Sequence, residues 1–444
     1  MTTPVNVQRT ASPKARTDDA TLKFGTVFTD HMFLEDYDAR RGWVNGRIEP
    51  YHHLSLDPAA AVLHYGQEIF EGLKAFRGVD GRVRLFRPRR HAERLVNSAR
   101  RVCIPPMDVD HVVDSFVRLV SVERDWVPHT PGTSLYVRPT IIATEPFLGV
   151  RPAANYLYYI ILSPVGAYHS AGLAPIKILV EEQYARAVQG GVGAAKTGGN
   201  YAASLLASEE ARQLGFDQVL WLDGAHRRSI DEVGTMNIMV RINDEVLTPP
   251  LSGTILAGVT RDSVITLLRD WGIPVSERPV TIDEVVRAAA DGSLRELWGT
   301  GTATGILPVG ELGYRGQTLM VNGGHTGEWT QRLSDALQAL QYGMDSDPHE
   351  WMLELQTEDL VDEASRESFP APPVSVSSPA SPIRTVGIDV AAALSVSSPA
   401  SPNARGCSMP ANVAIRCVFS VAVVSVRTIV DDGGGPPKLK TPCT

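Results

Sequence analysis

The sequence contains few cysteines, no excess of positive charge and no long apolar run. Of its four cysteines, only Cys103 lies in the first 400 residues; the other three are Cys407, Cys417 and Cys443. This distribution excludes a disulfide framework from most of the chain, so we expect a reducing compartment. The formal net charge of −8 argues against a general nucleic-acid binder and gives no reason to expect an anionic membrane surface as a partner.

Targeting features are also missing. Residues 1–21 are polar and have no apolar core of the kind that a secretory signal needs. No apolar run approaches the ~20 residues of a membrane-spanning helix. The longest candidate, near 413–426, is interrupted by Arg416. We therefore expect a cytoplasmic protein with no membrane partner and no metal site.

The body of the chain alternates between two kinds of periodic segment. Residues 134–142 and 156–162 have the β-branched and aromatic content that is typical of strands. Helices are predicted to begin at Pro88, after Thr260 and after Asn200, which is a favourable N-cap residue. The apolar stripe of the first helix consists of Ala92, Leu95, Val96 and Ala99. Mixed strands and helices predict an α/β or α+β fold, and 444 residues suffice for two or three domains.

Changes in composition predict where the domains end. The stretch from Pro164 to Pro175 contains glycines and is the best candidate for a hinge, and beyond Met352 proline and serine come to dominate. The octapeptide Ser-Val-Ser-Ser-Pro-Ala-Ser-Pro occurs twice there, in a composition that buries too little apolar surface to offset the entropy of ordering. A regulatory role of this tail and a frame-shifted or read-through origin both stay open. The expected organisation is a disordered N-terminus at 1–21, a small α/β domain at 22–164, an interdomain loop at 165–175, a large domain at 176–352 and a disordered tail at 353–444.

One lysine stands among small residues. Residues 190–204 read Gly-Gly-Val-Gly-Ala-Ala-Lys-Thr-Gly-Gly-Asn-Tyr-Ala-Ala-Ser, so Lys196 has room for another molecule beside its amine. Three interpretations compete. A glycine-rich surface loop leaves the lysine solvated, whereas a phosphate-binding P-loop fits Lys196 and Thr197 but has Ala195 in place of its second glycine. A cofactor lysine forms a Schiff base with a carbonyl, such as that of pyridoxal phosphate.

The third interpretation requires a carboxylate for the pyridine nitrogen and ligands for the phosphate. Glu232 is the candidate for the nitrogen, although an acid before a Val-Gly turn is commonly a solvated loop residue. Val259 and Thr260 open a predicted helix, where free N–H groups and the helix dipole attract an anion. A glycine-rich loop adds the Thr302 hydroxyl, and the basic run 87–94 offers a guanidinium for bidentate phosphate binding.

A set of motifs, spread over the body in a fixed order, carries a family resemblance. It consists of Phe28-Thr-Asp-His-Met, Phe70-Glu-Gly-Leu-Lys-Ala-Phe, Ser134-Leu-Tyr-Val-Arg-Pro, Gly190-Gly-Val-Gly, Lys196-Thr-Gly-Gly-Asn-Tyr, Glu232-Val-Gly-Thr-Met-Asn, and Gln341-Tyr-Gly followed by His349-Glu-Trp-Met. Together they resemble the branched-chain amino acid aminotransferases, which are fold-type IV pyridoxal-phosphate enzymes. The resemblance covers roughly residues 24–352 and favours the cofactor interpretation of Lys196.

The resemblance implies a role for each matching residue. Lys196 is implied to be the Schiff-base lysine, Glu232 the acid at the pyridine nitrogen, and Tyr201 the tyrosine near the phenolic oxygen of the cofactor. The implied phosphate ligands are Arg94, Val259, Thr260 and Thr302. The implied substrate-binding residues are Phe28, Tyr65, Phe70, Tyr136, Arg138, Thr235 and Ala303, the last two on the side of the substrate carboxylate.

The same resemblance implies a fold and an activity. The expected fold has a smaller N-terminal α/β domain and a larger C-terminal cofactor-binding domain with a β-barrel-like core. The expected activity is ping-pong amino-group transfer between L-leucine, L-isoleucine or L-valine and 2-oxoglutarate, by a homodimer in which residues cross between subunits. The redox-sensitive thiol pair of animal members is expected to be absent, because Thr304 and Leu307 occupy its positions. The open alternatives are another fold-type IV enzyme, namely a D-amino acid aminotransferase or an aminodeoxychorismate lyase, and a P-loop nucleotide-binding module.

Overall fold

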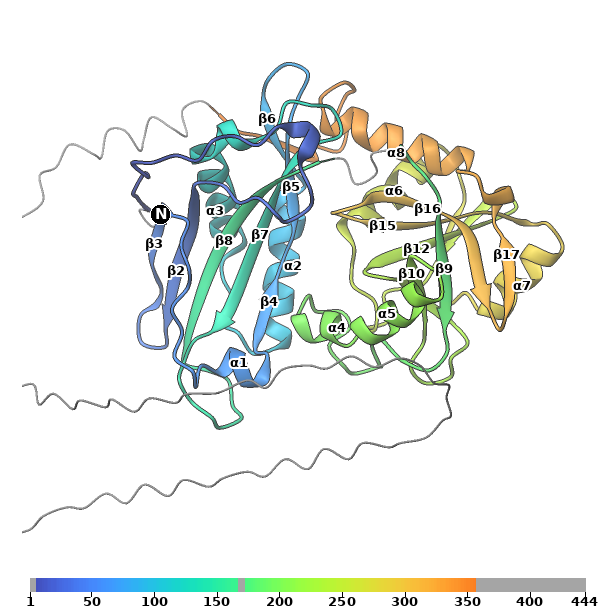
Figure 1. Ribbon diagram of the computed structural model, residues 1–444, viewed down its shortest axis with the longest axis horizontal. Coiled ribbons are helices and arrows are strands. Elements are labelled where there is room, and N and C mark those ends of the chain that lie inside the picture. The colour runs from blue at the N-terminus through green and yellow to red at the C-terminus, as the bar shows by residue number, and fades with distance from the viewer. Residues whose placement is uncertain (1–4, 167–171, 357–444) are drawn as a thin grey trace, which may run out of the picture. The chain divides into compact units, whose positions relative to one another are not determined.

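The computed structural model describes residues 5–166 and 172–356, which form two nine-stranded β-sheets (Figure 1). The first sheet has the order β1-β3-β2-β8-β7-β5-β6-β18, with β4 paired to β7. Only β1, which runs parallel to β3, departs from antiparallel pairing in this sheet. Its strands are β1 (Asn6–Val7), β2 (His31–Asp38), β3 (Gly42–Pro50), β4 (Glu68–Phe70), β5 (Leu73–Arg77), β6 (Val83–Phe86), β7 (Ser134–Ala143), β8 (Asn155–Val165) and β18 (Met352–Glu354).

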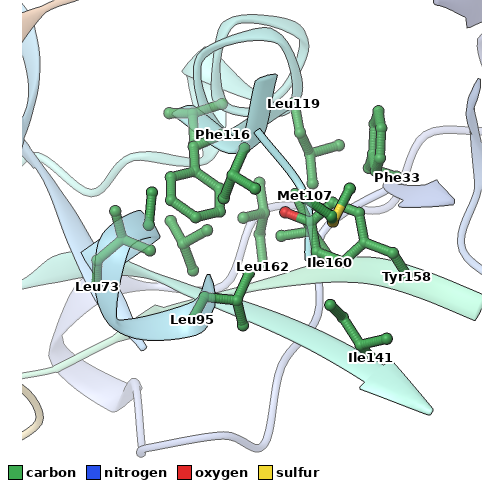
Figure 2. Close-up of a cluster of buried hydrophobic side chains, with 14 of the residues drawn as sticks. Phe33, Leu73, Leu95, Met107, Phe116, Leu119, Ile141, Tyr158, Ile160 and Leu162 are labelled. Carbon is green, nitrogen blue, oxygen red and sulfur yellow. The ribbon is translucent and has the colours of Figure 1, made fainter. Parts of the chain in front are cut away.

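Two helices, α2 (Pro88–Arg101) and α3 (Val109–Val122), pack together against the first sheet. The helix predicted from Pro88 is confirmed, and the members of its apolar stripe are all buried. Figure 2 shows side chains of both helices meeting those of the strands in one hydrophobic cluster: Leu95, Phe116 and Leu119 from the helices, and Phe33, Leu73, Ile141, Tyr158, Ile160 and Leu162 from the strands. Strands β7 and β8 are buried along most of their length, which explains their nearly continuous apolar sequence.

The second sheet closes into a barrel. Its order is β11-β10-β9-β16-β15-β12-β13-β14, with β17 paired to β16, and an additional pairing of β11 with β12 joins β9, β10, β11, β12, β15 and β16 into a ring of six strands. The expected β-barrel-like core is therefore confirmed. The strands are β9 (Ile176–Glu181), β10 (Gln218–Leu222), β11 (Ile230–Val233), β12 (Met236–Ile242), β13 (Glu245–Thr248), β14 (Val275–Glu277), β15 (Leu294–Gly301), β16 (Gly305–Tyr314) and β17 (Gln317–Met320).

Helices α5, α6, α7 and α8 pack against strands of the second sheet, whereas α1 lies beside β7 and α4 beside β4. In Figure 1, α8 runs along the upper side of the barrel and α4 and α5 lie below it. These helices are α1 (Ala61–Tyr65), α4 (Gly198–Ala202), α5 (Leu205–Gln213), α6 (Val259–Asp270), α7 (Ile282–Ala290) and α8 (Glu328–Gln341), with 3-10 turns at Asp19–Thr21, Arg124–Trp126 and Asn322–Gly324. Within the described ranges, no helix combines the length and the apolar character that crossing a bilayer requires.

Three expectations need correction. Residues 5–21 are not disordered, because β1 pairs with β3 and the Lys14 backbone N–H donates to Asp30 at 2.8 Å. The boundary at 352/353 falls inside β18, and the Leu355 N–H donates to the Val83 carbonyl at 3.0 Å. The rest of the expected tail, 357–444, and part of the expected interdomain loop, 167–171, lie outside the described residues. The division of the body at 165–175 stays a prediction.

The third correction concerns the helix expected after Asn200. The N-cap of α4 is Thr197, and Asn200 lies inside this helix, which is followed by a separate helix, α5. The Asn200 side chain donates instead to the carbonyl oxygens of Val192 and Ala195, at 2.9 and 2.8 Å. Its amide therefore fixes the glycine-rich loop rather than capping a helix.

Candidate active site

A cavity of about 290 Å³ is lined by residues of both sheets and of the helices and loops beside them. Loops and element ends supply most of its wall, as is usual for sites that rigid scaffolds position. It brings together twelve of the residues singled out in the sequence: Phe70, Arg94, Tyr136, Arg138, Lys196, Tyr201, Glu232, Thr235, Val259, Thr260, Thr302 and Ala303.

Lys196 lies in the loop before α4, and residues of the first sheet and α2 hold its backbone. Its N–H donates to the Ser98 hydroxyl at 2.9 Å, and its carbonyl accepts from the Phe70 N–H at 3.0 Å. Ser98 lies one helical turn after Arg94, so one face of α2 fixes the spacing between the lysine and the arginine. The Lys196 Nζ donates to the Tyr201 hydroxyl at 2.7 Å. Burial lowers the pKa of Lys196 and raises the pKa of Tyr201 to about 12, so the amine loses a proton easily while the phenol keeps its own.

The residues expected to bind phosphate converge at one end of the cavity. Helix α6 begins there at Val259, and its N-cap residue Gly258 provides no side-chain acceptor, so the first N–H groups of the helix are free for an anion. Arg94 approaches the same end, where its Nη1 donates to the Ala257 carbonyl at 3.1 Å. Thr302 lines the cavity beside them. Positive charge, a helix N-terminus and a hydroxyl therefore meet at one place.

A buried carboxylate holds Arg94. The Arg94 Nε donates to Glu71 Oε2 at 2.7 Å and Nη2 donates to Oε1 at 2.5 Å, while the His91 Nδ1 lies 3.3 Å from Oε1. Glu71 is fully buried. Burial opposes its ionisation, but the pairing with Arg94 and His91 outweighs that effect and holds the pKa of Glu71 well below its usual range. This fork-to-fork pair fixes the plane of the guanidinium.

Glu232 lies at another part of the wall, with each carboxylate oxygen in a different environment. Its Oε1 accepts from the Leu256 N–H at 2.9 Å and from Asn237 Nδ2 at 3.1 Å. Its Oε2 lies 3.2 Å from the Nε of Arg186. Burial raises the pKa of Glu232, and the charge of Arg186 opposes that shift. The solvated-loop interpretation of this acid is therefore wrong.

Aromatic rings and a guanidinium form the remaining side. Tyr136 and Arg138 share a face of β7, as predicted, and the Arg138 Nη2 donates to the Tyr136 hydroxyl at 3.1 Å. The Arg138 guanidinium lies 4.9 Å from the ring centre of Phe70, and Phe24 packs edge-on against Tyr136 with ring centres 4.9 Å apart. A Cβ at Gly72 would lie 1.8 Å from the Tyr136 hydroxyl, so glycine is required there. An aliphatic group and an anion both find partners on this side.

Two predicted residues do not line this cavity. Phe28 stacks on Tyr51 with ring centres 5.3 Å apart. The Tyr65 hydroxyl donates to the Leu148 carbonyl, and the side chain is exposed. Their substrate-binding roles stay predictions.

Sequence reasoning missed four residues that the geometry makes prominent. Arg186 and Phe24 line the cavity, Glu71 holds Arg94, and Ser98 holds the Lys196 backbone. A signal existed for Glu71 and Ser98. The former lies within the motif that begins at Phe70, and the latter follows Arg94 by four residues on the predicted helix. Arg186 and Phe24 lie in segments without periodicity.

Known proteins are similar to this chain over most of its length. The model of the class IV aminotransferase family matches residues 68–312. Branched-chain-amino-acid aminotransferase 2 of Bacillus subtilis is 52% identical over 351 residues, which are 79% of this chain and 97% of the relative. The probable branched-chain-amino-acid aminotransferase of Streptomyces coelicolor is 47% identical over 358 residues, 79% of this chain and 99% of the relative. The chain belongs to the branched-chain-amino-acid aminotransferases of class IV.

Solved structures show the same fold. The branched-chain amino acid aminotransferase of Escherichia coli is 27% identical, with a TM-score of 0.61 over 74% of this chain and 99% of that one. The branched-chain amino acid aminotransferase of Thermobaculum terrenum, in its PLP form, is 21% identical, with a TM-score of 0.60 over 74% of this chain and 99% of that one. Membership of the family makes the chain a pyridoxal-phosphate aminotransferase and rules out a P-loop nucleotide-binding module as its function. The role of Lys196 as the Schiff-base lysine stays a prediction.

The residues of the cavity fit pyridoxal phosphate. The anion-binding end carries free N–H groups of α6 and the guanidinium of Arg94, which suit a phosphate. Lys196 supplies the amine, and Glu232 supplies a buried carboxylate for a protonated ring nitrogen. Buried polar atoms at the cavity that lack a partner, Arg138 Nε and Thr300 Oγ1, also fit a site that completes its contacts with a ligand.

Proposed function

We propose that this branched-chain-amino-acid aminotransferase transfers the amino group of L-leucine, L-isoleucine or L-valine to 2-oxoglutarate in a ping-pong reaction, giving branched 2-oxo acids and L-glutamate. The observation that carries the proposal is the arrangement around Lys196, with Glu232 and Arg94 in one cavity beside the face formed by Tyr136 and Arg138. A D-amino acid aminotransferase or an aminodeoxychorismate lyase shares the lysine and the acid. The curated relatives and the combination on β7 favour branched substrates.

Each residue has a proposed task. When bound, pyridoxal phosphate supplies an electron-withdrawing ring that stabilises negative charge at the substrate Cα. Arg94, the first N–H groups of α6 and Thr302 hold the phosphate, and Glu232 keeps a proton at the ring nitrogen. The Lys196 Nζ is the base that moves the α-proton, and burial favours the neutral form that this task needs because it lowers the pKa of the amine. Tyr201 holds that amine in place through the 2.7 Å hydrogen bond.

Other residues that line the cavity are proposed to bind the substrate. Phe70 and the ring of Tyr136 offer apolar surface to a branched side chain, and Arg138 offers its guanidinium to the second carboxylate of glutamate. Thr235 and the Ala303 backbone line the side assigned to the substrate α-carboxylate. One pocket that accepts both kinds of amino acid is what amino-group exchange between them requires.

We also propose a homodimer in the cytoplasm. Near Tyr65, large apolar side chains are exposed on α1 and on the loop before β8: Leu63, Phe147, Leu148 and Val150. An exposed apolar cluster of this kind is typical of an interface, and it supports the expectation of a homodimer. Sedimentation velocity on the wild type and on Leu148→Asp tests it, because a variant that sediments as the wild-type dimer contradicts this interface.

A titration followed by visible absorption tests the activity. We expect L-leucine to change the spectrum of the holoenzyme and 2-oxoglutarate to reverse the change, whereas D-alanine has little effect. Lys196→Ala is expected to abolish turnover, while Lys177→Ala, at an exposed ion pair with Glu311, serves as the matched control. Turnover of D-alanine in preference to L-leucine, or near wild-type activity of Lys196→Ala, would overturn the proposal.

A further inference from the structure

A second lysine, Lys74, contacts the wall of the active-site cavity from outside that cavity. Lys74 lies on β5, and its side chain lines a second cavity of about 330 Å³ that has no assigned role. Its Nζ donates to the Ala303 carbonyl at 2.9 Å, a link between residues 229 positions apart in the sequence. Lys74 does not line the cavity that holds Lys196.

The Ala303 carbonyl belongs to the turn that joins β15 to β16. This turn, Thr302–Thr304, separates the two cavities, because its residues line both of them. None of its three N–H groups donates a hydrogen bond to another described residue. N–H groups at a cavity wall that have no partner in the protein can donate hydrogen bonds to a bound ligand. These N–H groups are therefore available to an anion or a carbonyl group that binds at the turn.

The ammonium group of Lys74 lies next to these donors, because it contacts the carbonyl of the same turn. Burial lowers the pKa of Lys74 to about 8, and no carboxylate of the described residues opposes the shift. The side chain is thus mainly an ammonium at neutral pH. Holding the Ala303 carbonyl fixes the peptide planes of the turn, and a charged donor makes this hydrogen bond about twice as strong as a neutral one.

We propose that Lys74 is a positioning and specificity-determining residue for the substrate α-carboxylate, which it serves by fixing the turn Thr302–Thr304 through the Ala303 carbonyl and by placing a positive charge behind it. The inference rests on the proposed function, in which this turn faces the α-carboxylate. Both amino acids and both 2-oxo acids of the exchange carry that carboxylate, so Lys74 contributes to the binding of all four.

Binding measurements on the holoenzyme test the inference directly. The ligands are 4-methylpentanoate, which is leucine without its amine, and the uncharged 4-methylpentan-1-ol of similar shape. We expect Lys74→Met to weaken binding of the carboxylate by about tenfold, because the turn then loses its anchor and the positive charge beside it, and to leave binding of the alcohol unchanged. Lys74→Arg is expected to restore most of the carboxylate affinity. Lys74→Gln, which keeps a neutral donor, is expected to restore less.

The controls separate positioning from general damage. Lys177→Met removes an exposed lysine and is expected to change neither affinity. In turnover, Lys74→Met is expected to raise the KM of L-leucine and of 2-oxoglutarate while kcat stays near the wild-type value. Equal losses for acid and alcohol, or unchanged carboxylate binding in Lys74→Met, overturn the inference. If Lys74→Met does not fold, the ratio of acid to alcohol affinity in Lys74→Gln and Lys74→Arg decides it. If the wild type does not exchange amino groups, the proposed function is contradicted and not the role of Lys74. Wild-type activity is therefore measured before any variant is made.

Discussion

Arg186 lies against Glu232 in the wall of the active site, with its Nε 3.2 Å from the carboxylate Oε2 and both side chains less than one-tenth exposed. The second oxygen of this carboxylate already accepts from Leu256 and Asn237. Burial raises the pKa of Glu232, and the charge of Arg186 is the main force against that shift. The charge of Arg186 thereby favours the ionised form of Glu232, which is the form that an acid needs in order to hold a proton on a ring nitrogen.

Arg186→Met is expected to slow turnover through Glu232. Without the positive charge, the pKa of Glu232 rises further, so a larger fraction of the carboxyl is protonated near neutral pH. We expect kcat to fall by about tenfold or more, which is at least about 1.4 kcal/mol of barrier. The acidic limb of the pH–rate profile is expected to move to higher pH, so that part of the lost rate returns as the pH is raised. Arg186→Lys is expected to keep most of the activity. A profile with an unmoved acidic limb in Arg186→Met would show that Arg186 does not set this ionisation.

Arg94→Met is expected to lower both cofactor affinity and the stability of the protein without cofactor. It leaves the Glu71 carboxylate buried and unpaired, which costs about 3–5 kcal/mol. The wild-type Glu71 has a depressed pKa, so its contribution is present above the ordinary pKa near 4.5 and is lost as the pH falls below it. In Arg94→Met the pKa of Glu71 rises, so the deficit in the urea midpoint is expected to shrink between pH 8 and pH 5.

A double variant separates the two roles of Arg94. Glu71→Gln combined with Arg94→Met removes the unpaired charge and is expected to recover part of the stability but none of the cofactor affinity. Arg212→Met, at an exposed pair with Glu209, is the matched control and is expected to behave as the wild type. If Arg94→Met lowers the urea midpoint by the same amount at pH 8 and at pH 5, the unpaired charge of Glu71 is not the cause of the lost stability.

Ser98→Ala is expected to loosen the lysine loop. The Lys196 N–H loses its acceptor, and a buried donor without a partner costs about 1–3 kcal/mol. We expect a lower thermal midpoint and a lower kcat, because the amine is then placed less accurately relative to Arg94. Ser208→Ala removes a local hydroxyl bond to the Ser204 carbonyl and serves as the control. Equal thermal midpoints of the wild type and Ser98→Ala would mean that this hydrogen bond contributes nothing to the loop.

The parts of the site that the sequence predicted are local in the chain. Lys196 stands out by the small residues around it, and Tyr136 and Arg138 share a face because strand side chains alternate. The two helices that begin at Pro88 and near Thr260 follow from apolar periodicity and end signals within single segments.

The parts that escaped prediction depend on partners that are distant in the sequence. Glu71 is important because it pairs with Arg94, and Lys74 because it contacts Ala303. Neither contact produces a recognisable pattern in the sequence of the two segments that it joins. The predicted start of α4 was wrong because the Asn200 side-chain amide donates to carbonyl oxygens of the preceding loop and does not cap a helix. Closure of the barrel was expected from the family resemblance alone, because it depends on the pairing of β11 with β12, which short-range periodicity does not encode.

Truncation is expected to show that the fold closes at β18. Trp351 is buried, its carbonyl accepts from the Arg87 N–H at 2.6 Å, and β18 pairs with β6 before Leu355 ends the described fold. A chain that ends after Gln356 is therefore expected to keep the activity and thermal midpoint of the full chain. Trp351→Ala is expected to destabilise the protein by about 3–5 kcal/mol, because it opens a cavity in the hydrophobic cluster that Trp351 shares with α6 and α8. Activity assays and thermal unfolding of the two proteins check this, and loss of activity on removal of residues 357–444 would contradict the prediction.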